Sequence, residues 1–164
     1  MAPVNKLRLD IFEILDKVRK SRAKNDKIAI LRKNESWALK DVLGGTFDEN
    51  VEWNLPLGEP PYKPSDPHNA PTNLHRQNTQ FRNFFKGGPG DKLSVVKRES
   101  LFIGLLEGIH PEDAKVVINM INKKKPEGIT RAIVEEAFPG LTTGNPDLTG
   151  VYDNDVPRDR LPRI

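Results

Sequence analysis

The sequence predicts an all-α fold: a compact bundle of six or seven short helices with a proline-rich extended loop and a C-terminal tail. Apolar residues recur at helical spacing through most of the chain. Serine, threonine, glycine and proline punctuate these segments at positions typical of helix ends. The helical pattern stops near residue 141. We therefore expect a single helical domain over residues 1–141 and a flexible tail over residues 142–164.

The first predicted helix covers residues 5–20. Its apolar side chains fall on one helical face; they are Leu7, Ile11, Ile14, Leu15 and Val18. Many basic residues follow between Lys17 and Lys27. We interpret this basic stretch as a solvated helix end, because Asp16 and Asp26 interrupt it.

Two more short helices are predicted, one over residues 24–33 and one from about Ser36 to Leu43. Asn34 or Ser36 can cap the start of the later helix, since a side-chain oxygen there accepts a bond from an unpaired backbone N–H. The pair Gly44-Gly45 is predicted to end it, because glycine readily adopts the positive φ found after a helix C-terminus.

Residues 46–74 form a proline-rich arm within the helical domain and contain six of the chain's 14 prolines. Proline fixes φ and lacks an N–H donor, so neither a helix nor a central strand can run through this arm. We expect an extended segment laid over the core and pinned by Trp53, Leu55, Leu57 and Tyr62.

The arm is also a candidate partner-binding segment. The spacing from Pro61 to Pro64 is that of peptides that dock in aromatic grooves. The candidate contacts are Trp53, Pro61, Tyr62 and Pro64. Because this spacing often occurs by chance, a purely structural arm is the favoured interpretation.

Residues 75–86 are compatible with a helix whose apolar face holds Phe81, Phe84 and Phe85. The glycines and proline of residues 87–90 then break the chain. The central helix is predicted over Leu93–Ile109, because its middle is apolar all round. Gly104 costs this helix roughly 1 kcal/mol relative to alanine, so we expect another element to cross closely there.

Two helices are predicted to complete the domain. Pro111 follows His110 and precedes two acidic residues, a pattern typical of a helix start, so a helix is expected to about Asn122. The last helix is expected from Thr130, with Ile129 before the cap and Val134 inside the helix as a hydrophobic staple.

Two basic clusters are candidate contacts for nucleic acid or for a partner protein. One cluster combines cations with the phenylalanines of residues 75–86, a combination that can neutralise phosphates and stack bases; its cations are Arg76, Arg82 and Lys86. The other cluster is Lys123, Lys124 and Lys125. The alternatives are a solvated outer helix face for the first cluster and favourable interaction with a helix dipole for the second.

No pattern indicates catalysis, a metal site or a cofactor. The chain has no cysteine, and its three histidines are not at metal-ligand spacing. The segment Gly87–Ser94 differs from a phosphate-binding loop, because Asp91 stands where the glycine before the lysine belongs. No apolar run has the length of a membrane span. We expect a soluble intracellular protein that is not an enzyme and does not act at a membrane.

Four segments resemble an uncharacterised family of small proteins encoded by large, contractile-tailed bacteriophages of marine bacteria and cyanobacteria. The segments are residues 27–43, 47–64, 97–120 and 128–140. The most specific parts are LEGIHPEDA, residues 106–114, and AFPG, residues 137–140. The resemblance implies a phage protein made in the cytoplasm of a bacterial host. It implies no catalytic or binding residue, because the family's function is unknown.

The leading hypothesis is a non-enzymatic phage accessory protein that binds a macromolecular partner in phage DNA replication or transcription. A phage or host protein is the expected partner, and nucleic acid is the other candidate. One alternative is a structural virion component whose arm and tail are ordered by neighbouring subunits. A second alternative is an inhibitor of a host factor.

Overall fold

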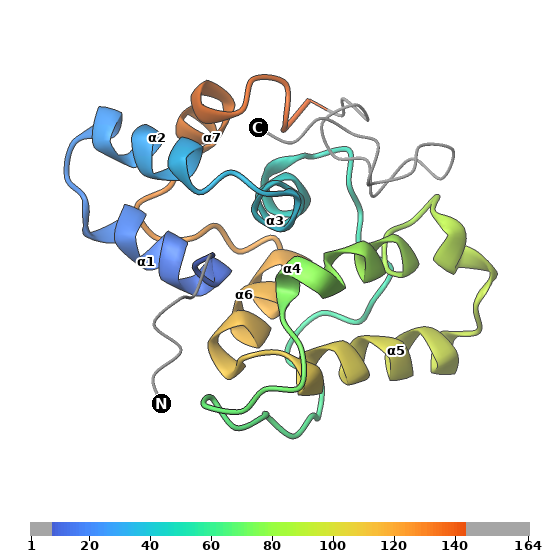
Figure 1. The fold of residues 1–164 in the computed structure, drawn as a ribbon. Coiled ribbons are helices and arrows are strands. Elements are labelled where there is room, and N and C mark those ends of the chain that lie inside the picture. Colours follow the sequence, from blue (N-terminus) through green and yellow to red (C-terminus); the bar gives the residue numbers. More distant parts are fainter. Residues whose placement is uncertain (1–7, 144–164) are drawn as a thin grey trace.

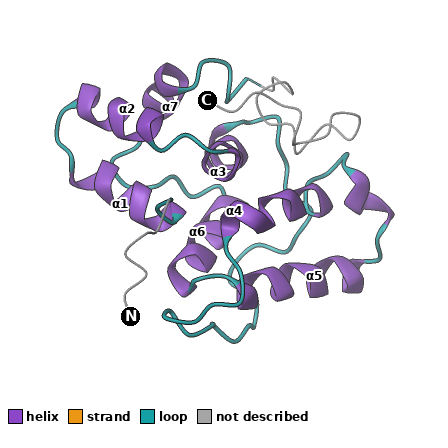
Figure 2. Cartoon of the chain, viewed as in Figure 1, coloured by secondary structure: helices purple, strands orange, loops and turns teal. Residues whose placement is uncertain are grey.

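The computed structural model describes residues 8–143, and it confirms the predicted all-α class (Figure 1). Within these residues no strand occurs, and helices are joined by loops and turns (Figure 2). The α-helices are α1 (Ile11–Lys20), α2 (Lys24–Lys33), α3 (Trp37–Phe47), α4 (Leu74–Gln77), α5 (Val95–Gly108), α6 (Pro111–Ile121) and α7 (Arg131–Ala137). Two short 3-10 helices, η1 (Asn78–Asn83) and η2 (Pro89–Lys92), lie between α4 and α5.

Helix α3 lies at the centre of the bundle (Figure 1). It packs on α6, α4 and η1, and α6 in turn contacts α1 and α5. Helices α1, α2 and α7 pack in sequence on one side, since α2 contacts both of the others. The core is therefore built around α3 and α6.

Every residue of α3 is buried, including two charged ones. The ammonium of Lys40 forms an ion pair with Glu35 and lies 5.1 Å from the ring centre of Trp37. The carboxylate of Asp41 accepts a hydrogen bond of 2.7 Å from the side-chain amide of Asn78. A buried charge is tolerated only when it has partners, and these contacts provide them.

The prediction that Leu93–Ile109 is the central helix is wrong. The observed helix, α5, lies at the edge of the bundle, and only four of its residues are buried (Figure 1). Gly104 is exposed, and no described atom lies within 4 Å of the position its Cβ would take. The prediction rests on the apolar composition of α5. Helix α3 is the enclosed one, although its charged residues make it look less apolar in the sequence.

The prediction that Gly44-Gly45 ends the third helix is also wrong, because α3 continues to Phe47. A Cβ on Gly45 would lie 2.5 Å from a ring carbon of Trp53 and 2.8 Å from the sulfur of Met120. The arm and α6 therefore both approach the α3 backbone at Gly45. The close crossing expected at Gly104 occurs here instead.

The observed helix starts agree better with those predicted from the sequence. The side chain of Ser36 accepts a bond from the N–H of Leu39, and His110 Nδ1 accepts one of 3.0 Å from the N–H of Glu112. Thr130 caps α7, as predicted. Helix α1 starts at Ile11, so the predicted start at residue 5 is wrong for residues 8–10, and Leu7 lies outside the described residues.

The single helix predicted over residues 75–86 is not formed; α4 and η1 cover this segment. The reason is backbone pairing with the arm, in which the N–H of Asn54 donates to the carbonyl of Phe84 at 2.6 Å. The N–H of Lys86 likewise donates to the carbonyl of Glu52 at 2.8 Å. A continuous helix could not present these groups to the arm.

The proline-rich arm runs along α5 and α6 and is fixed by hydrogen bonds. The side chain of Asn122 bonds both the N–H and the carbonyl of Gly58, at 2.7 and 3.2 Å. The N–H of Lys63 donates to the carboxylate of Glu107 at 2.8 Å. Leu57 does not pin the arm as predicted, because it is 81% exposed.

Of the predicted tail, only Thr142 and Thr143 belong to the described chain. Thr142 is completely buried. The ordered contacts therefore extend past the expected boundary at residue 141, and the rest of the predicted tail lies outside the described residues.

We predict that Gly45→Ala lowers the free energy of unfolding, although alanine favours helix. The new methyl group collides with Trp53 and Met120, and overpacking of this kind costs about 1–3 kcal/mol. Urea denaturation measures the change. A variant as stable as the wild type would show that the indole and the thioether move aside without cost.

Candidate functional site

Lys123 was predicted to contact a partner, but the structure gives it an internal role. Its ammonium donates hydrogen bonds of 2.8 Å to the carbonyls of Gly45 and Asp48, at the C-terminal end of α3. Burial lowers the pKa of Lys123, against the opposing effect of nearby acidic side chains such as Asp48. The lysine thus adds a charged donor to carbonyls at a helix end, where the helix itself supplies no N–H partner.

The neighbouring lysines are directed differently. Lys124 and Lys125 are both exposed. The ammonium of Lys125 lies 6.0 Å from the ring centre of Phe47, within the range of a cation–π contact. Of the three lysines in this predicted cluster, two thus remain accessible to a partner.

The phenylalanine-bearing cluster is divided by the fold. Phe81 and Phe84 are fully buried, so neither can stack on a base. Arg76 and Lys86 are exposed, and Lys86 pairs with Glu52 at 3.6 Å. Arg82 is half-buried. The combination of exposed aromatic rings and cations that motivated this cluster is therefore absent from residues 81–84.

The four candidate contacts of the arm are also divided. Trp53 is buried, and its indole N–H donates to the carbonyl of Gly45 at 2.9 Å. Tyr62 is half-buried against the core. Pro61 and Pro64 are exposed. The arm therefore turns its aromatic residues inward and its prolines outward.

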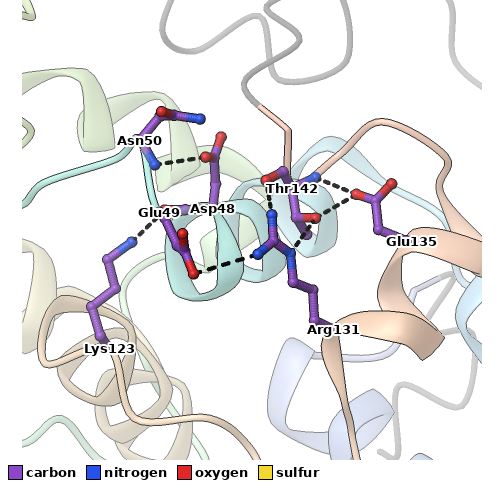
Figure 3. Close-up of polar contacts among 7 residues, drawn as sticks. All are labelled: Asp48, Glu49, Asn50, Lys123, Arg131, Glu135 and Thr142. Atoms are coloured by element: carbon purple, nitrogen blue, oxygen red, sulfur yellow. Dashed lines mark hydrogen bonds and ion pairs between the residues drawn. The ribbon is translucent and has the colours of Figure 1, made fainter.

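A second polar network ties α7 to the last described residues (Figure 3). The guanidinium of Arg131 donates to both the hydroxyl and the carbonyl of Thr142, at 3.1 and 3.0 Å, and pairs with Glu49 at 3.5 Å. The carboxylate of Glu135 accepts the N–H groups of Gly140 and Thr142. Burial acts to raise the pKa of Glu135, but its hydrogen bonds and Arg131 together lower it. Glu135 is therefore an anchoring carboxylate.

Asp113 is the most unusual titratable group of the described chain. It is 1% exposed, and Oδ1 accepts the N–H of Phe12 at 2.8 Å, so it joins the start of α6 to the start of α1. Phe12 in turn stacks on His110, with ring centres 4.5 Å apart. Burial raises the pKa of Asp113 to about 7, although the bond from Phe12 opposes the shift.

No cluster of metal-ligating side chains is seen among residues 8–143. They contain no group of three or more His, Cys, Asp or Glu side chains placed to hold a metal ion. Glu35, Asp41, Asp113 and Glu135 are each engaged in the internal contacts described above. None of the helices in this part of the chain is both long enough and apolar enough to cross a membrane.

The junction of α1 and α2 carries a group of exposed charges and lies at the edge of the molecule opposite η2 (Figure 1). We call its five exposed cations the basic tip; they are Lys17, Arg19, Lys20, Arg22 and Lys24. No acidic residue occurs between Lys17 and Lys24. Lys17 and Arg22 form no ion pair with a described residue.

The other cations of the basic tip form exposed ion pairs. Arg19 and Lys20 both pair with Asp16, and Lys24 lies 3.2 Å from Glu136. Exposed pairs of this kind contribute little and exchange readily. Helix α2 has Ala23 at its N-cap position and so lacks a side-chain cap, whereas α3 to α7 each have one. The exposure of these cations agrees with the sequence interpretation of this stretch as a solvated helix end.

We predict that Lys123→Met destabilises the protein by about 1–3 kcal/mol, because two buried carbonyls lose a charged donor while the aliphatic stem is kept. Lys124→Met is the matched control, and we expect it to change stability by less than about 0.5 kcal/mol. Chemical denaturation compares the two variants. Equal effects would contradict the internal role of Lys123.

We predict that Asp113 makes stability depend on pH. Its pKa is raised to about 7 from the ordinary 3.8 of an aspartate, so the folded state holds this proton more tightly than the unfolded chain. Its contribution is complete below about pH 4 and is lost as the pH rises through 7.

The test is the difference in unfolding free energy between wild type and Asp113→Asn, measured from pH 4 to pH 8. This difference should fall by up to about 4 kcal/mol as the pH rises. The exposed Asp26→Asn variant controls for the change in net charge. A difference that stays constant with pH would contradict the prediction.

Comparison with known proteins identifies the family of the chain. No curated protein matches it. A family model described as a family of unknown function, DUF6433, matches residues 14–126. This range covers most of α1, helices α2 to α6, the arm, the basic tip, Gly45 and Lys123. The chain belongs to the DUF6433 family, whose function is unknown.

Proposed function

We propose that the protein is a non-enzymatic accessory protein that binds nucleic acid through the basic tip. The observation that carries this proposal is the distribution of charge. Residues 17–33 contain eight Lys or Arg residues and one acidic residue, a formal charge of +7 in a chain whose net charge is +3. The remaining residues are therefore net acidic. Clustered charge of this kind attracts a polyanion at long range.

The geometry of the tip favours contact with phosphates over reading of bases. Its cations surround the C-terminus of α1 and the N-terminus of α2, so no helix presents a long exposed face to a groove. Helix α3, which follows α2 after a short turn, is wholly buried and cannot act as a recognition helix. We therefore expect binding with little sequence preference and a strong dependence on salt.

The phage setting is part of the proposal and is supported by the resemblance of four segments to contractile-tailed phage proteins. In that setting, a protein that binds phosphates without reading bases fits the machinery of DNA replication or transcription. The predicted contacts Arg76, Lys86, Lys124 and Lys125 are exposed and could extend the surface. The proposal does not depend on them.

A protein partner on the arm is a second candidate function. Leu57 is 81% exposed, and Pro61 and Pro64 are accessible beside it. Such a partner would fit either a virion neighbour or a host factor. Mass spectrometry of purified particles separates these two, because only a structural virion component is present there in stoichiometric amount.

We predict that Lys17→Gln/Arg22→Gln weakens binding to DNA. Fluorescence anisotropy with a labelled duplex, over a series of salt concentrations, measures affinity and its salt slope. Loss of two phosphate contacts should reduce the slope by about 1.8. The matched control is Lys63→Gln/Lys92→Gln, which removes the same charge at exposed positions elsewhere and should retain the wild-type slope.

Two results would contradict the proposed function. One is the absence of binding to duplex or single-stranded DNA at low salt. The other is an equal loss of affinity in the tip variant and the control variant, which would mean that net charge alone matters.

A further inference from the structure

Helix α5 carries an exposed face that no described element covers. Its residues lie at the spacing of a single helical face; they are Lys97, Ser100, Gly104 and Glu107. Val96 borders this face and is 79% exposed. Val95, Val96 and Leu57 are the exposed large apolar side chains of the described chain, so two of the three belong to the first turn of α5.

Gly104 has no internal explanation. It lies in the middle of a helix, where glycine costs roughly 1 kcal/mol relative to alanine. Gly45 is explained by the side chains that touch it, but a Cβ on Gly104 would meet no described atom within 4 Å. A glycine that is exposed in one copy of the chain permits close approach by something outside that copy.

The charges on this face are self-complementary. Lys97 and Glu107 lie five residues on either side of position 102, and Ser100 and Gly104 lie two residues on either side of it. In an antiparallel pair of α5 helices with a twofold axis at the level of residue 102, Lys97 of each copy faces Glu107 of the other. The same register places the hydroxymethyl group of Ser100 against Gly104.

Both charged groups remain accessible for such pairing. Glu107 is exposed, and its carboxylate accepts one bond, from the backbone N–H of Lys63. Lys97 forms no ion pair within residues 8–143. Two residues at this separation are about 15 Å apart along a helix, so the two ion pairs would fix the register at both ends of the contact.

We propose that a second copy of this chain docks on this face, forming a twofold-symmetric dimer through antiparallel packing of α5 on α5. With a small residue such as Gly104 at the crossing, the two helices can approach closely. The closer packing compensates for the small width of the contact surface. The basic tip is on other helices, so this inference is independent of the proposed nucleic-acid binding.

The test is the mass of the full-length chain in solution, measured by sedimentation or light scattering over a series of concentrations. The wild type should form dimers. Lys97→Glu and Glu107→Lys should each shift it to monomer, because each places like charges opposite one another twice. The double variant Lys97→Glu/Glu107→Lys should restore the dimer, since the swapped charges again face their opposites.

Gly104→Gln gives a second, steric test. The side chain meets open space in a single copy, so thermal unfolding at low concentration should be unchanged or improved while the dimer is lost. Ala29→Gln, at an exposed position of α2, is the matched control and should leave the dimer intact. A wild type that is monomeric at every concentration would overturn the inference. So would a dimer unaffected by Gly104→Gln, or one that the charge swap fails to restore.

Discussion

The C-terminal end of α3 is the point on which the rest of the fold depends. A helix enclosed on all sides cannot leave its last carbonyls to water, so the protein must supply donors from inside. The indole of Trp53 and the ammonium of Lys123 both donate to the carbonyl of Gly45, and Lys123 also reaches Asp48. Trp53 belongs to the arm and Lys123 to the segment after α6. One carbonyl therefore connects three parts of the chain that are distant in sequence.

That arrangement has consequences for where function can lie. The sequence predicts Trp53 and Lys123 as contacts for a partner, but both side chains bond carbonyls inside the protein. Charges on α2 are partly used in the same way, because Lys27 donates to the carbonyl of Gly128 and Arg32 to that of Glu136. Within residues 17–33, the basic residues that remain directed outward are mainly those of the basic tip. Within this one basic stretch, Lys27 and Arg32 therefore bond carbonyls of the fold, whereas the residues of the basic tip supply surface charge.

Much of the local structure could be predicted from residue order. The caps Ser36, His110 and Thr130 act within two or three residues of themselves, so their signals are local and the structure confirms them. Most of the predictions that were wrong needed knowledge of long-range contacts. The sequence predicts a helix end at Gly45 and a close crossing at Gly104. The crossing lies at Gly45 instead, because Trp53 and Met120 approach it, and no local pattern places these residues beside α3. The internal role of Lys123 escapes prediction for the same reason, because its partners lie 75 and 78 residues away.

By itself the sequence determined the all-α class, most of the helix starts, the proline-rich arm and the concentration of positive charge at residues 17–33. Each of these follows from periodicity, backbone preference or net charge, which are properties of neighbouring residues. Only the tertiary structure decided which helix is enclosed. From the sequence alone, a charged residue such as Lys40 is expected at the surface; its burial is explained only by the ion pair with Glu35. It also decided that the arm turns Trp53 inward and that the outer face of α5 is left uncovered by the described chain.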